Sequence, residues 1–250
     1  MKIVMLMGGG LFFVVSSIVG LRLLALGIRN RTLPELSLAA AFLLGGTIGG
    51  LLGQLVYTRS IDLEPAQMGA LVLTYTVFSM LGMTLYNVFT WRVFRPDAAG
   101  AAVVGFVLLT GLGMMAWYAS IGSFGHGRVS TEQRAVETLI NAVGPVWAMI
   151  EALRYYRSMR RRLALGLADP VIANRILLWG IGSALASTIV LASLIQTVVP
   201  PTHILVELAT LNIGVCGSVA SLIYALAFFP PARYRAWLRA GAPAAPVPGD

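Results

Sequence analysis

Apolar and polar positions segregate along this chain in long blocks, not residue by residue. Seven runs of about 20 or more mainly apolar residues, each bounded by Arg, Pro or polar clusters, occupy most of the sequence. A helix of about 20 apolar residues is long enough to cross the roughly 30 Å hydrocarbon core of a bilayer. The pattern therefore predicts helices over residues 3–27, 36–58, 67–91, 99–120, 133–156, 171–198 and 203–229.

The predicted fold class is all-α: a polytopic bundle of seven transmembrane helices over residues 1–229. Hydrophobic residues make up 58% of the chain and charged residues 11%, which leaves no segment for a soluble domain. Residues 230–240 combine aromatic side chains with arginines, a pattern typical of a short amphipathic helix at the membrane interface. The Ala-, Pro- and Gly-rich residues 241–250 are predicted to form a disordered tail.

The basic residues predict an orientation. Of the 18 lysine and arginine residues, 14 fall in or next to the loops after helices one, three and five and in the tail, and four fall on the other side. The positive-inside rule places the richer side in the cytoplasm, so the N-terminus is predicted outside and the C-terminus inside. Because 17 of the 18 are arginine, the composition favours a bacterial protein of the inner (plasma) membrane.

Several function classes are excluded by what the sequence lacks. There is no soluble module to present a groove-reading element, so the net charge of +8 indicates anionic lipid at the inner face and not nucleic acid. A single cysteine rules out an intramolecular disulfide and a thiolate metal cluster. No lysine lies in helix seven for a retinal Schiff base, and neither a phosphate-binding loop nor a nucleophile elbow is present. No cofactor is predicted.

Helix two carries glycines at four-residue spacing, Gly45, Gly49 and Gly53. Small residues at this spacing let two helix backbones approach closely in lipid. Tight packing within the chain is the first interpretation, and a homo-oligomer through these glycines is the alternative.

Polar side chains inside the predicted spans are candidates for function, because ionisable groups are costly in the bilayer. Helix five places Glu137 and Asn141 on one face, and helix three places Tyr75, Ser79 and Tyr86 on one face. Trp117, Tyr118 and Trp147 would line the same interior, between helices three, five, six and seven. The predicted ligand pocket therefore consists of the following residues: Tyr75, Glu137, Asn141, Trp147, His203 and Glu207.

His203 and Glu207 support three interpretations. Four residues apart on helix seven, they reach one point, and Glu137 would complete a zinc site with an open position for water. Alternatively they belong to a ligand- or proton-sensing pocket. The third interpretation is a solvated pair at a helix end, with Glu137 bonded to Asn141 or a neighbouring helix. His203 and Glu207 are thus only weak metal candidates.

The loops on the basic side place a few carboxylates among many arginines. Arginine pairs bidentately with carboxylates, so some of these groups are expected to lock loops together. The remainder would face lipid phosphate, a cytosolic protein partner or an anionic small molecule. The residues assigned to this face are Arg31, Glu35, Arg92, Arg95, Arg160, Arg161, Arg162, Asp169 and Arg175.

Four stretches resemble a family of bacterial seven-helix membrane proteins without an assigned activity. They are GLRLL at Gly20 to Leu24, RTLPE at Arg31 to Glu35, TWRVFRP at Thr90 to Pro96 and GLADPVIANRILLW at Gly166 to Trp179. The resemblance covers most of the chain and implies the fold and a membrane location only.

From the residues themselves, the function expected is that of a receptor- or sensor-like protein. It would couple an external or intramembrane pocket to the arginine-rich cytoplasmic face. The alternatives are an intramembrane metal-dependent lipid hydrolase, which would require Glu207, and a small transporter, which would require Glu137 or Glu151.

Overall fold

The computed structural model describes residues 2–58 and 62–240. Within these ranges it contains helices and no strand, and seven helical segments are long and apolar enough to cross a membrane. The predicted all-α bundle of seven such helices is therefore confirmed. The predicted disordered tail, residues 241–250, lies outside the described residues.

The helices follow one another along the chain as α1 (Lys2–Asn30), α2 (Leu33–Ala40), η1 (Ala41–Gly49), α3 (Gly50–Thr58), α4 (Pro65–Phe94), α5 (Ala98–Ser120), α6 (Ser123–His126), α7 (Thr131–Ala164), α8 (Pro170–Val198), α9 (Ile204–Phe228) and α10 (Ala232–Ala240). The segments α2, η1 and α3 form one uninterrupted rod, the second spanning helix, whose central part η1 is a π-helix.

The predicted helix ends agree with the structure except at α7, which continues to Ala164 instead of ending near residue 156. Its last turns carry exposed arginines and leave the apolar part of the bundle. Arginine is a good helix former, so the change to basic residues marks the end of the apolar stretch and not the end of the helix. The helix stops only before Gly166, which adopts a positive φ of 68°.

Aspartate caps start two of the spanning helices. The Asp97 carboxylate accepts a hydrogen bond from the Gly100 backbone N–H, and the Asp169 carboxylate accepts one from the Val171 N–H. Pro170 follows Asp169 in the first turn of α8, as its missing N–H and restricted φ favour. Hydrogen bonds to the Asp97 carboxylate lower its pKa, whereas partial loss of hydration raises it. The Gly100 N–H, followed by the Arg95 guanidinium, lowers the pKa of the Asp97 carboxyl below its ordinary value.

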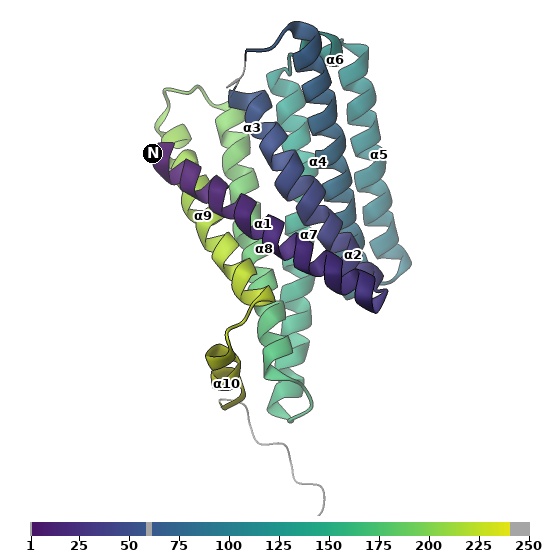
Figure 1. Ribbon diagram of the computed structural model, residues 1–250, viewed down its shortest axis with the longest axis vertical. Helices are drawn as coiled ribbons and strands as arrows, with labels where there is room; N and C mark the ends of the chain where they lie inside the picture. The colour runs from purple at the N-terminus through teal and green to yellow at the C-terminus, as the bar shows by residue number, and fades with distance from the viewer. Residues whose placement is uncertain (1, 59–61, 241–250) are drawn as a thin grey trace, which may run out of the picture.

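The bundle has two halves joined by α7 and crossed by α1. The first half holds the second spanning helix, α4 and α5, and the second half holds α8 and α9, while α7 packs on α4, α5 and α8. Figure 1 shows α1 running obliquely across the front of the bundle, and α1 packs against α9, α2 and η1. A Cβ atom on Gly8 would lie 2.6 Å from the Gly214 carbonyl oxygen, so the backbones of α1 and α9 touch here.

The four-residue glycine series of the second spanning helix packs within the chain. Cβ atoms on Gly45, Gly49 and Gly53 would meet α4 at 3.0 Å from the Gly82 Cα, 3.5 Å from the Ser79 nitrogen and 2.9 Å from a Tyr75 ring carbon. Tight intramolecular packing therefore occupies this face. Whether copies of the protein also associate through it stays a prediction.

Helix α10 lies apart from the spanning helices, beside the lower end of the bundle in Figure 1. It packs on α8, where the Tyr234 hydroxyl donates to the Asn174 side-chain oxygen at 3.2 Å. The helix itself appears where the sequence predicts one, at residues 230–240. Its position at a membrane interface stays a prediction.

Candidate functional site

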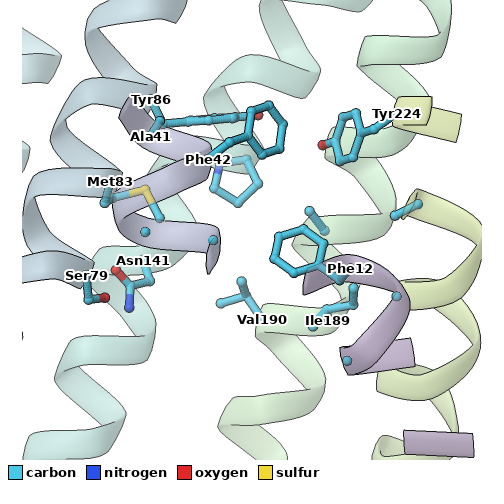
Figure 2. Close-up of a pocket in the computed structure, with 18 of the residues that line it drawn as sticks. Phe12, Ala41, Phe42, Ser79, Met83, Tyr86, Asn141, Ile189, Val190 and Tyr224 are labelled. Atoms are coloured by element: carbon cyan, nitrogen blue, oxygen red, sulfur yellow. The ribbon is translucent and has the colours of Figure 1, made fainter. Parts of the chain in front are cut away.

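A cavity of about 400 Å³ lies between the two halves of the bundle, behind α1. Figure 2 shows side chains from several helices around a common empty centre. The lining residues are Gly8, Gly9, Phe12, Ala41, Phe42, Gly45, Gly46, Ser79, Gly82, Met83, Tyr86, Asn141, Pro145, Ala186, Ile189, Val190, Ile213, Gly217, Ala220 and Tyr224. They come from six of the seven spanning helices, and none of them is charged.

Small residues create the space. Six glycines and three alanines line the cavity, on η1, α1, α4, α8 and α9. In η1 the Gly50 backbone N–H bonds to the Gly45 carbonyl, five residues back, which is the hydrogen-bond pattern of a π-helix. Such segments are frequent at functional sites, and here the π-helix supplies Ala41, Phe42 and two glycines to the wall. The Ser17 hydroxyl bonds to that of Thr47 at 3.1 Å and ties η1 to α1.

The wall includes the Asn141 amide, whose oxygen is buried. This oxygen accepts no hydrogen bond from any residue within 2–58 and 62–240. Ser79 lies beside Asn141 in Figure 2, whereas Phe42, Tyr86 and Tyr224 gather on the opposite part of the wall. There the Tyr86 hydroxyl is 3.1 Å from the Ser183 hydroxyl. The cavity is therefore mainly apolar, and a ligand N–H or O–H would satisfy the buried Asn141 oxygen.

Glu137 does not line this cavity; three phenols surround its carboxylate. The hydroxyl of Tyr75 donates to Oε1 at 2.5 Å, and those of Tyr57 and Tyr118 donate to Oε2 at 3.1 and 3.2 Å. The residue is 2% exposed, and the Arg134 guanidinium stacks over the Tyr57 ring at 4.4 Å. The phenols come from α3, α4 and α5, so the carboxylate of α7 joins four helices.

The predicted pocket residues therefore separate. Tyr75 and Glu137 lie together in the phenol cluster, and Asn141 lies in the cavity wall. Trp147 is half-buried and is absent from that wall. Of the aromatic residues expected to line the interior, Tyr118 is fully buried against Glu137.

His203 and Glu207 lie on α9, away from the phenol cluster. The Nδ1 atom of His203 accepts the Leu205 backbone N–H at 3.2 Å and caps the helix, and both residues are exposed. Both carboxylate oxygens of Glu137 face phenols from other helices, so Glu137 does not complete a site with His203 and Glu207. Within residues 2–58 and 62–240, no three His, Cys, Asp or Glu side chains are placed to hold a metal ion. The capping contact of His203 and the exposure of both residues agree with the interpretation of His203 and Glu207 as a solvated pair at a helix end.

At the end of the bundle that carries most arginines, called here the arginine-rich end, Glu151 is the centre of an ion-pair group. Arg95 and Arg154 approach its Oε1 at 3.4 and 3.5 Å, and Arg95 also pairs with Asp97 at 3.2 Å. These contacts tie α7 to the α4–α5 connection, whereas pairing between two loops stays a prediction.

The other residues assigned to this face are spread over it. Arg31 ends α1 with a positive φ of 55°, and Arg92 stacks on Trp91 at 4.1 Å. Arg160, Arg161 and Arg162 are exposed at the end of α7. Asp169 is used as the cap of α8. Contact with lipid or with a protein partner stays a prediction for these arginines.

A second pocket, of about 280 Å³, opens between α1, α2, α4, α8 and α9 at the arginine-rich end. Its walls are mainly apolar, and Arg22, Glu35 and Arg175 also line it. We call it the Arg22–Arg175 pocket. It shares no lining residue with the cavity.

Trp179 connects the two spaces. It lines the Arg22–Arg175 pocket, stacks on Tyr86 with ring centroids 5.7 Å apart, and packs against Phe42 and Tyr224 of the cavity wall at 6.4 and 5.2 Å. We call the rings of Phe42, Tyr86, Trp179 and Tyr224 the aromatic partition. Sequence reasoning missed it, because these residues are far apart in the chain. The GG pairs at residues 45–46 and 49–50 were the one signal of unusual backbone packing nearby.

Comparison with known proteins does not extend this picture: no family model, no curated protein and no solved structure matches the chain. The function is therefore derived from the residues of the protein itself.

Proposed function

We propose that this multi-pass membrane protein is receptor- or sensor-like and binds a mainly apolar small molecule in the cavity beside Asn141. The proposal rests on a cavity of about 400 Å³ whose walls are mainly apolar and whose buried Asn141 oxygen accepts no hydrogen bond from a described residue. Volumes of this order are usual for small-ligand sites, which combine apolar walls with a few placed polar groups. A buried acceptor without a partner is costly, and a ligand that donates one hydrogen bond would remove that cost.

The aromatic partition supports a sensing role. A ligand would touch Phe42, Tyr86 and Tyr224, whose rings pack on Trp179. Any movement of these rings changes the wall of the Arg22–Arg175 pocket, because Trp179 belongs to that wall. Ligand-dependent shifts of packed side chains are a common way to bias one arrangement of helices over another.

The direction of signalling follows from the charge distribution. With the arginine-rich end in the cytoplasm, as the positive-inside rule indicates, the ligand reaches the cavity from the bilayer or the outer side. The signal then passes to anionic lipid or a cytosolic protein at the inner face of a plasma membrane.

Hydrolase and transporter activities have less support. A hydrolase using zinc would need Glu137 next to His203 and Glu207, whereas Glu137 is bonded to three phenols. A proton- or ion-coupled transporter would need a titratable group in the transport path, and none of the described lining residues of the cavity is charged.

Binding of a medium-chain alcohol, compared with the alkane of the same length, tests the cavity. The alcohol should bind purified protein more tightly than the alkane, and Asn141→Leu should weaken alcohol binding by about tenfold, as expected for one hydrogen bond. Native mass spectrometry or a calorimetric titration in a neutral detergent would measure both.

Asn212→Leu is the matched control. Asn212 also has a buried side-chain oxygen without a hydrogen bond, but it does not line the cavity. If this variant lost alcohol binding as much as Asn141→Leu, or if alcohol and alkane bound equally well, the proposed site would be wrong.

A thiol-attached fluorophore tests the sensing role. Ser158 is exposed near the end of α7, and Cys216 is the single native cysteine. A dye on Ser158→Cys in a Cys216→Ser background should change its emission when the alcohol is added. In the Asn141→Leu background the same change in emission should require about tenfold more alcohol. An emission that does not change in protein that binds the alcohol would contradict sensing.

A further inference from the structure

The Arg22–Arg175 pocket contains two positive groups that form no ion pair with the described residues. Arg22 comes from α1 and Arg175 from α8, and the end of α9 positions both. The Arg22 guanidinium lies over the Phe229 ring at 4.4 Å, and the Arg175 Nε donates to the Ala227 carbonyl at 3.1 Å. That carbonyl belongs to the last turn of α9, where the helix dipole attracts a cation.

Neither guanidinium is neutralised within the described part of the chain. The ion pairs there use Arg95 and Arg154 only, so no carboxylate oxygen lies within 4.0 Å of Arg22 or Arg175. Glu35 is the only acidic residue of the lining, which leaves the pocket with one net positive charge. The terminal Nη groups of Arg175 keep their donors for a ligand.

The interior of the pocket suits hydrocarbon. Most of its lining is aliphatic or aromatic, including Leu23, Leu38, Phe89 and Phe228. Trp179 also lines the pocket and is 4% exposed, and its buried indole N–H has no acceptor among the described residues. A free ion would use the charges but not the apolar walls, and a neutral hydrocarbon would use the walls but not the charges.

We propose that the Arg22–Arg175 pocket is a binding site for an anionic amphiphile, with a phosphate or carboxylate head between Arg22 and Arg175 and its hydrocarbon against the apolar walls. Arginine binds such oxyanions with paired N–H donors. The site is separate from the Asn141 cavity and does not depend on the function proposed for that cavity, because no lining residue is shared.

Lysophosphatidic acid, a single-chain phosphate monoester, is the probe for this test. Purified full-length protein in a neutral detergent should bind it at least tenfold more tightly than lysophosphatidylcholine of the same chain, whose head has no net charge. Arg22→Gln and Arg175→Gln should each weaken binding by about tenfold, the loss expected for a charged hydrogen-bonded contact. A fatty acid of the same chain should compete, and inorganic phosphate at the same concentration should not.

The control is Arg29→Gln, which removes an exposed arginine of α1 at the same end that does not line the pocket. Equal losses in Arg29→Gln and Arg175→Gln would mean general attraction to the arginine-rich end and would overturn the proposal. Competition by inorganic phosphate as strong as that by the amphiphile would also overturn it. Trp179→Phe retains a ring in the partition but loses the N–H, and it should give a smaller loss than either arginine variant.

Discussion

Two buried glutamates on the same helix are stabilised by opposite kinds of partner. Glu137 and Glu151 are separated by roughly 21 Å along the axis of α7, at 1.5 Å per residue. Glu137 accepts hydrogen bonds from three phenols, whereas Glu151 lies between the guanidiniums of Arg95 and Arg154. Both residues are under 10% exposed, so burial alone does not distinguish them.

The difference follows from where water is available. Arg95 and Arg154 have side chains that are 42% and 63% exposed, so their charges remain hydrated while they pair with Glu151. Around Glu137 the donors are aromatic, and a phenol hydroxyl can be buried at lower cost than a guanidinium. The comparison teaches that a buried carboxylate in this fold is satisfied by neutral phenol donors near the start of α7 and by charged donors at the arginine-rich end.

Removing Glu137, the acceptor of the phenol hydrogen bonds, should reduce stability to unfolding more than any other change considered. Glu137→Ala removes the acceptor of the buried Tyr75 and Tyr118 hydroxyls, and we expect a loss of about 3 kcal/mol, because each unsatisfied buried donor costs about 1–3 kcal/mol. Tyr57 is 37% exposed and can still bond to Tyr75, so it should add little. Thermal unfolding in detergent would measure the loss. Glu137→Gln, which keeps one acceptor oxygen, should lose less. Glu207→Ala is the matched control, since Glu207 is exposed on α9 and should change little.

Removing a single phenol hydroxyl should reduce stability to an intermediate extent. Tyr75→Phe deletes the shortest of the three hydrogen bonds to Glu137 but leaves the other two, and we expect a loss of about 1.5 kcal/mol. Tyr155→Phe is the control, because Tyr155 is exposed and its hydroxyl bonds to none of the described residues. Equal melting temperatures for Tyr75→Phe and wild type would show that the phenols do not stabilise the carboxylate.

The ion-pair group should be weaker and sensitive to salt. Glu151→Ala frees two arginines that can hydrate, so we expect a loss of about 1 kcal/mol in dilute buffer. The difference from wild type should shrink in 1 M salt, where the Debye length is about 3 Å, whereas that of Glu137→Ala should not. A salt-independent Glu151→Ala effect would mean that the two glutamates are stabilised alike.

Replacing the exposed Asp97 should have the smallest effect on stability, and that effect should depend on pH. Its pKa is lowered mainly by the Gly100 N–H and then by Arg95, so its contribution is present above the ordinary pKa of an aspartate and is lost as pH falls through the lowered value in the folded protein. The difference in melting temperature between wild type and Asp97→Ala should therefore vanish in strong acid. A difference that is constant from neutral to acidic pH would contradict the assigned cause.

Much of the site was beyond sequence reasoning for a specific reason. Asn141 and Glu137 lie on one face of α7, and helical periodicity correctly groups them, but it does not say which neighbouring helix each side chain meets. Tyr57 and Tyr118 meet Glu137 from positions 80 and 19 residues away. Likewise, the distance along the chain between Phe42, Tyr86, Trp179 and Tyr224 hides the aromatic partition between the two spaces.

The sequence by itself determined the seven spanning helices, their approximate ends and the concentration of arginines at one end. These features depend on the length, hydropathy and charge of each segment, which can be evaluated without knowing its neighbours. Only the tertiary structure decided which polar groups meet. It placed Glu137 among phenols, left the Asn141 oxygen without a partner in a cavity and held Arg22 and Arg175 at the end of α9. Such contacts depend on how helices cross and on where glycines let their backbones touch, which no single helix specifies.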